Sequence, residues 1–185
     1  MLFTPGPTAV PPEVREVMSE PQPNSAVQSE FADLYDQLCE NLQAVYDTDH
    51  DVIVPGGEGI LGLEAAIASL VAPGDRVLCI SNGIYGDGFA DFVADYDGEA
   101  ELVSAAYNAG YDLDAIEDTL AAAKEAGEPF KIATLVHCET PTGTLNDLSP
   151  VLDLLDEYDV LSVVDAVSSL GGTPVPTDRI DVCLG

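Results

Sequence analysis

The residue of this sequence best placed to do chemistry is Asp165, which ends a short apolar run. The apolar residues of that run are Val160, Leu161, Val163 and Val164. A largely β-branched run of this kind is typical of a buried parallel strand. In open α/β sheets, ligands bind outside the carboxyl ends of the strands, so an acid at this position suits a functional site. A lone acid could equally cap a turn.

The residues around Asp165 favour the functional interpretation. Residues 163–174 read V-V-D-A-V-S-S-L-G-G-T-P. This segment resembles the cofactor-site segment of the class V, pyridoxal-phosphate-dependent aminotransferases, and most closely that of the alanine–glyoxylate and serine–pyruvate aminotransferases. In that family the aspartate pairs with the pyridine nitrogen of the cofactor. A buried carboxylate keeps that nitrogen protonated, and the ring then acts as an electron sink. The resemblance implies that Asp165 is catalytic and binds pyridoxal 5'-phosphate.

The resemblance covers essentially the whole chain and implies further cofactor contacts. The stretch G-G-E-G-I-L-G opens a helix, whose free amino-terminal amides suit an anion. By resemblance, the phosphate of the cofactor lies on the amides of Gly59 and Ile60. Tyr85 falls where the family places an aromatic ring that stacks on the cofactor. In the turn H-C-E-T-P-T-G, Thr140 matches the residue that hydrogen-bonds the ring oxygen. Neither this turn nor its histidine implies a metal.

The same glycine-rich stretch permits a second interpretation. Gly57-x-Gly59-x-x-Gly62 matches the dinucleotide-binding fingerprint, but the next strand, expected at Arg76–Ile80, runs into Ser81-Asn82 rather than into an acid. A nucleotide-binding domain is therefore the weaker alternative. Glu58 stands where many class V members have Ser or Thr, and a carboxylate there cannot donate a hydrogen bond to phosphate.

Composition limits the class of protein. The chain has 185 residues, 34 acidic side chains against 5 basic ones, and a net charge of −29. Nucleic acid or an anionic membrane surface requires basic patches, so neither is an expected partner. Such self-repulsion is tolerable near molar salt, where ions screen it. The composition resembles that of proteins from halophilic archaea; an acidic mesophilic protein is the alternative. Four separated cysteines, expected to be buried and reduced, and the absence of a secretory signal in the first residues indicate the cytoplasm.

The periodicity of the chain predicts an α/β fold with a mainly parallel sheet and helices on both faces. We expect an extended amino-terminal arm over residues 1–24, proline-rich at Phe3–Pro12, and a cofactor-binding large domain over 25–185. The expected strands are Asp51–Val54, Arg76–Ile80, Glu101–Ser104, Lys131–Val136, Val160–Val164 and Ile180–Leu184. The expected helices cover Ser25–Val45, the stretch after Gly57, Gly86–Tyr96, Leu113–Ala126 and Leu148–Glu157.

The end of the chain affects the expected activity. In the family, the last of these strands leads into a turn whose lysine carries the cofactor as a Schiff base. This sequence ends at Gly185, and neither Lys124 nor Lys131 matches that motif. We therefore expect the amino-terminal part of a homodimeric transaminase that acts on small amino acids and 2-oxo acids, such as alanine or serine with glyoxylate or pyruvate. The 185 residues alone are expected to be inactive; the alternative is a non-catalytic remnant or interaction module.

Overall fold

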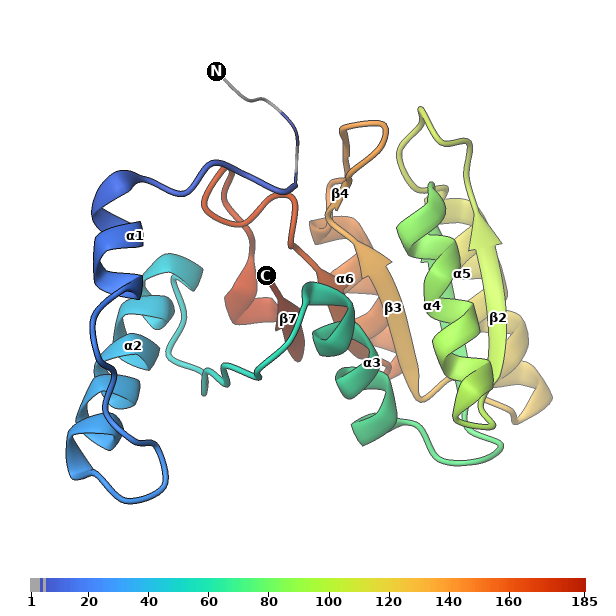
Figure 1. The fold of residues 1–185 in the computed structure, drawn as a ribbon. Helices are drawn as coiled ribbons and strands as arrows, with labels where there is room; N and C mark the ends of the chain where they lie inside the picture. The colour runs from blue at the N-terminus through green and yellow to red at the C-terminus, as the bar shows by residue number, and fades with distance from the viewer. Residues whose placement is uncertain (1–3, 5) are drawn as a thin grey trace.

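The computed structural model describes residue 4 and residues 6–185. Its centre is a sheet of five parallel strands in the order β2-β1-β3-β6-β7 (Figure 1). The strands are β1 (Arg76–Ser81), β2 (Glu99–Ser104), β3 (Ile132–Val136), β6 (Leu161–Asp165) and β7 (Val182–Leu184). The parallel sheet confirms the predicted fold class, and these five strands agree with their predicted positions within two residues at each end.

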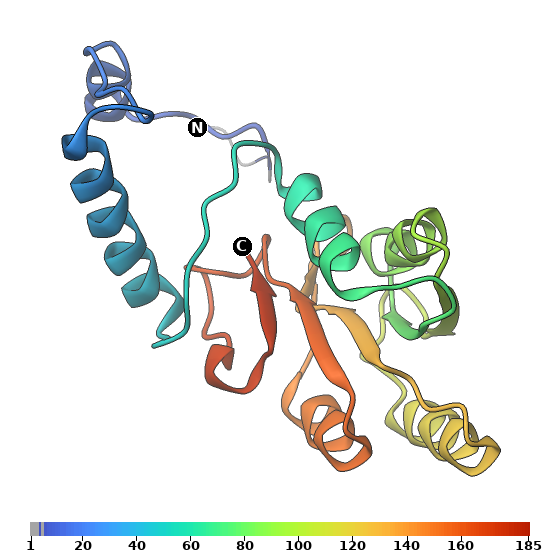
Figure 2. The same ribbon diagram turned by 90° about the horizontal axis from the view of Figure 1, so that it is seen from below.

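Helices cover both faces of the sheet, which divides the core into two layers (Figure 2). Helices α3 (Gly59–Leu70) and α4 (Ile84–Asp95) lie on one face, and α5 (Leu113–Ala126) and α6 (Ser149–Tyr158) lie on the other. The first layer is centred on Ile67 and Phe89, and the second on Ile116 and Leu152. Because β1, β3 and β6 are buried on both faces, their residues form nearly continuous apolar runs rather than alternating ones.

The ends of α5 show how local sequence sets the boundaries of these helices. The Asp112 side chain accepts a hydrogen bond from the amide of Ala115 at the amino terminus, at 3.2 Å. At the other end Gly127 adopts a left-handed conformation with φ of 75°, which closes the helix at little steric penalty. The predicted range Leu113–Ala126 is confirmed at both ends.

The amino-terminal region differs from the prediction at one place. Residues 12–18 form a short helix, α1 (Pro12–Met18), inside the arm that was expected to be extended over residues 1–24. Pro12 occupies the first helical position, where a missing amide has no effect on the helix. Of the predicted arm, residues 1–3 and 5 lie outside the described residues. Helix α2 (Ser29–Tyr46) is confirmed, but none of its residues is buried.

The predicted strand at Asp51–Val54 is wrong. These residues have no strand partner, and Ile53 is exposed. A groove of about 550 Å³, lined by Val52, Ala66 and Val182 among others, lies between them and β7. A strand exists only by pairing, so an apolar β-branched run without a neighbour stays extended but unpaired.

Two small elements were not predicted. A two-stranded hairpin, β4 (Cys138–Glu139) and β5 (Thr144–Leu145), comes directly after β3. A single 3₁₀ turn, η1 (Thr177–Arg179), precedes β7. The hairpin carries the turn H-C-E-T-P-T-G over the carboxyl edge of the sheet (Figure 1).

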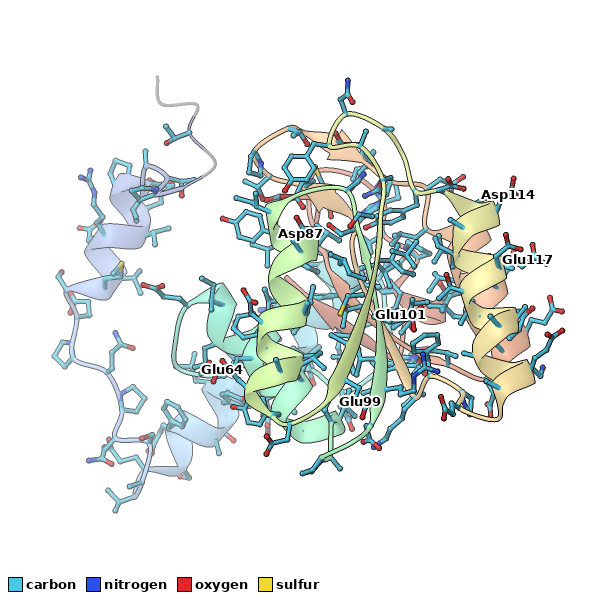
Figure 3. All side chains as sticks on the ribbon, turned by 90° about the vertical axis from the view of Figure 1, so that its right-hand side faces the viewer. Glu64, Asp87, Glu99, Glu101, Asp114 and Glu117 are labelled. Carbon is cyan, nitrogen blue, oxygen red and sulfur yellow. The ribbon has the colours of Figure 1, made fainter. Side chains whose placement is uncertain are left out.

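Of the acidic side chains in residues 4 and 6–185, only Glu139 and Asp165 are buried. Figure 3 shows acids of α3, α4, β2 and α5 directed outward around the sheet and its helices. Of the basic residues, Arg76, Lys131 and Arg179 pair with acids. The four cysteines form no disulfide, and the prediction that all are buried holds only for Cys79. Within the part of the chain that is described, no helix combines the length and the apolar character needed to cross a membrane.

Candidate functional site

Asp165 lies at the carboxyl end of β6, next to the centre of the sheet, and only 6% of it is exposed. Its Oδ1 accepts a hydrogen bond from the amide of Val167 at 2.9 Å. Its other oxygen has no hydrogen-bond partner, and no ion pair reaches it, among residues 4 and 6–185. Burial raises the pKa of Asp165, the charge of Glu139 raises it further, and the amide of Val167 acts in the opposite direction. A half-satisfied buried carboxylate of this kind favours a cationic hydrogen-bond donor.

Val167 connects Asp165 to the start of α3. A β-carbon built on Gly59 would lie 3.7 Å from a methyl group of Val167, so the side chain of Val167 lies next to the start of α3. The amides of Gly59 and Ile60 make no backbone hydrogen bond, and the amino-terminal cap, Glu58, makes no side-chain cap. These free amides carry the positive end of the helix dipole and point to an anion site.

Thr140 lies on the hairpin and contacts the turn after Asp165. Its hydroxyl shares a hydrogen bond with that of Ser168. In β3, Val136 pairs with Asp165, and the amide of His137 donates to the carbonyl of Asp165 at 2.8 Å. The two turns that follow β3 and β6 are therefore joined by both backbone and side chains.

Tyr85 lies in the first turn of α4, and 37% of it is exposed. Its amide donates to Oε1 of Glu139 at 3.2 Å, and the amide of Gly86 donates to Oε2 at 3.4 Å. The amino termini of α3 and α4 thus differ. The carboxylate of Glu139 occupies the amino terminus of α4, whereas the amino terminus of α3 stays open to an external anion.

Buried polar groups brace the same edge. The side chains of Asn82 and Asn146 hydrogen-bond each other at 2.7 Å and join the ends of β1 and of the hairpin. His137 Nδ1 lies 2.9 Å from the hydroxyl of Ser169. Because that hydroxyl donates to the carbonyl of Ala166, it accepts from His137. Burial lowers the pKa of His137, which favours the neutral ring. These contacts hold the strand-end loops in place.

The structure thus brings the five predicted site residues to one edge of the sheet: Gly59, Ile60, Tyr85, Thr140 and Asp165. The sequence did not identify Glu139, which links Tyr85 to the hairpin. No local pattern could reveal this contact, because 54 residues separate Tyr85 from Glu139. Its position in a strand-end turn was the only available signal.

The nucleotide alternative gains no support at this edge. The strand after the glycine-rich turn, β1, ends on Ser81, which hydrogen-bonds Asp87 at 2.6 Å. The next residue, Asn82, is bound to the carbonyl of Ala109 and to Asn146. A dinucleotide site requires an acid at the end of this strand to bind the ribose.

Comparison with known proteins assigns the chain to a family. The sequence profile described as Aminotransferase class-V matches residues 1–184. An uncharacterised aminotransferase of Methanocaldococcus jannaschii is 34% identical over 186 residues, which cover 100% of this chain and 47% of that protein. The pyridoxamine–pyruvate transaminase of Mesorhizobium japonicum is 34% identical over 142 residues, which cover 77% of this chain and 35% of that protein.

Solved structures agree with the sequence comparison. The alanine–glyoxylate aminotransferase of a Nostoc species superposes with a TM-score of 0.88 at 32% identity, over 97% of this chain and 47% of that one. The chain therefore spans less than half the length of each of these three proteins.

Proposed function

Because the chain belongs to the class V aminotransferases, we propose that it is the cofactor-binding part of a transaminase for small amino acids and 2-oxo acids. The cofactor of this family is pyridoxal phosphate. The amino donor we propose is alanine or serine, and the acceptor is glyoxylate or pyruvate. The observation that carries the proposal is the unpaired oxygen of Asp165, at the same edge as the open amino terminus of α3.

The residues at this edge fit a phosphorylated pyridine. Asp165 offers a carboxylate oxygen that lacks a cationic partner within the described chain, and burial of the residue raises its pKa. The amides of Gly59 and Ile60 offer the anion site. When bound, the cofactor supplies an electron sink that stabilises negative charge on the substrate.

In this proposal each residue has a defined task. Asp165 holds a proton on the ring nitrogen, because an ion pair at a buried site stabilises the charged form of both partners. Tyr85 covers one face of the ring and limits the access of water. Thr140, held by Ser168, hydrogen-bonds the ring oxygen. The side chain of Glu58, at the cap position of α3, makes no cap hydrogen bond to this helix, so it does not occupy the amides of Gly59 and Ile60.

Assembly and location form part of the proposal. Exposed apolar residues of α1 and α2, among them Val17, Met18 and Leu34, support a homodimer in which a second copy covers them. Free cysteines and the high acidic charge support a salt-rich cytoplasm. Small molecules are the proposed substrates; we propose neither a nucleic acid nor a membrane as partner.

The test uses the protein encoded by the complete reading frame that contains these residues. Pyridoxal phosphate is titrated into it while absorbance is followed, and amino transfer is measured with alanine or serine against glyoxylate or pyruvate. We expect saturable, stoichiometric binding and turnover with at least one pair. Binding without turnover would favour the non-catalytic module, and the absence of binding would refute the proposal.

A further inference from the structure

We propose that Glu139 is a positioning residue, which fixes the first turn of α4 and thereby the ring of Tyr85 at the site. The inference rests on the proposed function above, since it concerns how the ring is held against the cofactor. It starts from a feature that the assigned roles do not explain. Glu139 is 0% exposed and enters no ion pair among residues 4 and 6–185.

A buried carboxylate without a cation is costly unless backbone groups stabilise it. Glu139 meets this condition by accepting from the amides of Tyr85 and Gly86, at 3.2 and 3.4 Å. These amides belong to the first turn of α4, whose dipole also favours a negative charge. Glu139 therefore caps α4 from a hairpin more than fifty residues away.

No residue of α4 itself could supply this cap. The cap position is Gly83, which has no side chain to accept a hydrogen bond. A β-carbon on Gly83 would lie 2.1 Å from Cγ of Glu139, so the Glu139 side chain fills the space that a local cap would need. The two residues are complementary: Gly83 makes room, and Glu139 replaces the missing side chain.

The cap also sets the position of the Tyr85 ring. A residue in the first turn of a helix points where the backbone of that turn directs it, and an uncapped first turn frays. Glu139 is followed directly by Thr140, which is bound to Ser168 beyond Asp165. Two consecutive hairpin residues thus fix the aromatic ring on one side and the turn of Asp165 on the other.

The experiment is a double-mutant cycle on the full-length protein, with the dissociation constant of pyridoxal phosphate measured by direct titration. We expect Glu139→Gln to weaken binding about tenfold. The substitution removes a charge-assisted hydrogen bond, and it places the NH2 group of the glutamine side chain against a backbone N–H of α4, so that two donors face each other. In a Tyr85→Ala background, Glu139→Gln should weaken binding less than about twofold. If Glu139 acts through the Tyr85 ring, its effect on the free energy of binding is lost once that ring is removed, so the two effects are not additive. Equal effects in both backgrounds would overturn the inference.

Asp87→Asn is the matched control. It removes the same charge from the first turn of the same helix but leaves the amides of Tyr85 and Gly86 capped, because Asp87 contacts Ser81 and Tyr107. We expect less than about a twofold change in the dissociation constant. A loss equal to that of Glu139→Gln would show a general charge effect and would overturn the positioning role.

If a variant fails to fold, hydrogen exchange of the backbone amides in the cofactor-free wild type tests whether Glu139 caps α4. The amide of Tyr85, the second residue of α4, should exchange clearly more slowly than that of Ile60, the second residue of α3, which has no side-chain cap. Equal, fast exchange at both helices would overturn the cap. A wild type that binds no cofactor would refute the proposed function, whereas the exchange comparison would still test the cap.

Discussion

The amide of Val167 donates to Asp165 at 2.9 Å, and the turn closed by this bond sets Val167 against Gly59 at the start of α3. The turn after Asp165 therefore places the side chain of Val167 between the acid and the open terminus of α3. It also leaves the second oxygen of Asp165 without a partner among the described residues. The site is thus prepared for a ligand with a cationic and an anionic end, and an unbound Asp165 destabilises the fold.

Asp165→Asn should raise the stability of the cofactor-free protein at neutral pH. The pKa of Asp165 is raised by burial, so the folded state binds its proton more tightly than the unfolded state. Stability therefore falls as the pH rises through the unfolded-state pKa of about 3.9 towards the folded value. We expect the variant to melt about 2–4 °C higher at pH 7, a shift typical of ~1 kcal/mol in a domain of this size.

Melting temperatures of both proteins between pH 3 and pH 8 check this prediction. The difference should shrink as the pH falls to about 3, where Asp165 is mostly protonated in both states. Glu117→Gln, an exposed acid of α5, is the matched control and should show little change. An Asp165→Asn variant that is less stable than wild type at pH 7 would contradict the claim that the buried charge of Asp165 destabilises the cofactor-free protein.

Asp165→Ala should abolish most turnover of the full-length enzyme. Without the carboxylate the ring nitrogen loses its proton, and an unprotonated ring stabilises negative charge poorly. We expect turnover to fall by about 10²–10⁴-fold, the range typical of losing an electrostatic or proton-holding group. Steady-state kinetics with circular dichroism as the folding check decide the matter, and turnover near that of wild type would show that the assignment is wrong.

The sequence predicted the sheet well because its signals are local. The runs that form β1, β3 and β6 are buried on both faces, so their apolar character alone identifies them. Gly127 likewise ends α5 through its own backbone conformation. Asp51–Val54 has the same β-branched character but no partner strand, and no local pattern reveals whether a neighbour is present.

Part of the site was predicted and part was not, because only some of its residues carry a local sequence signal. Asp165, Tyr85 and Thr140 follow strands or open helices, so their motifs place them at one edge of a parallel sheet. The cap supplied by Glu139 depends on the packing of a hairpin against α4, and Gly83 does not indicate by itself that a side chain from elsewhere fills its place. Tertiary contacts of this kind can be found only in the structure.

The fold should require salt. Of the few basic residues, Arg76, Lys131 and Arg179 each neutralise acids at the protein surface, which leaves most of the 34 acids without a counter-charge. Screening over a few ångströms near molar salt reduces their repulsion. We expect the helical signal in circular dichroism to grow with potassium chloride towards the molar range. Full, cooperatively melting structure at low salt would contradict the halophilic interpretation.

The open edge of β7 should make the 185-residue chain associate. The groove beside β7 has apolar walls, and residues 52–54 on its far side pair with no strand. Unpaired backbone groups next to an apolar surface favour pairing between chains. We expect rapid exchange of the amides of Val52, Ile53 and Val54, and concentration-dependent association in light scattering. A monodisperse monomer in which these amides are protected would refute the prediction.

The two lysines of the 185-residue chain lie at the wrong edge of the sheet for catalysis. Lys131 precedes β3, whose five residues span about 16 Å before the level of Asp165. It pairs with Asp75 at 2.6 Å. Lys124 is near the carboxyl end of α5 and lies 4.9 Å from the centre of the Tyr158 ring. Since α5 returns the chain from the carboxyl edge to the amino edge of the sheet, Lys124 also points away from the site.

The 185-residue chain should therefore bind pyridoxal phosphate weakly and catalyse no amino transfer. Gly59, Ile60, Tyr85 and Asp165 provide contacts that hold the cofactor, but a positioned lysine is needed to move the proton, and such a base contributes about 10²–10⁴-fold in rate. The test adds pyridoxal phosphate to the purified chain, reduces with borohydride and maps the label by mass spectrometry. We expect only scattered, substoichiometric labelling and no turnover. A single stoichiometric label on Lys124 or Lys131, together with alanine–glyoxylate turnover, would show that one of them reaches Asp165 by a rearrangement of the sheet.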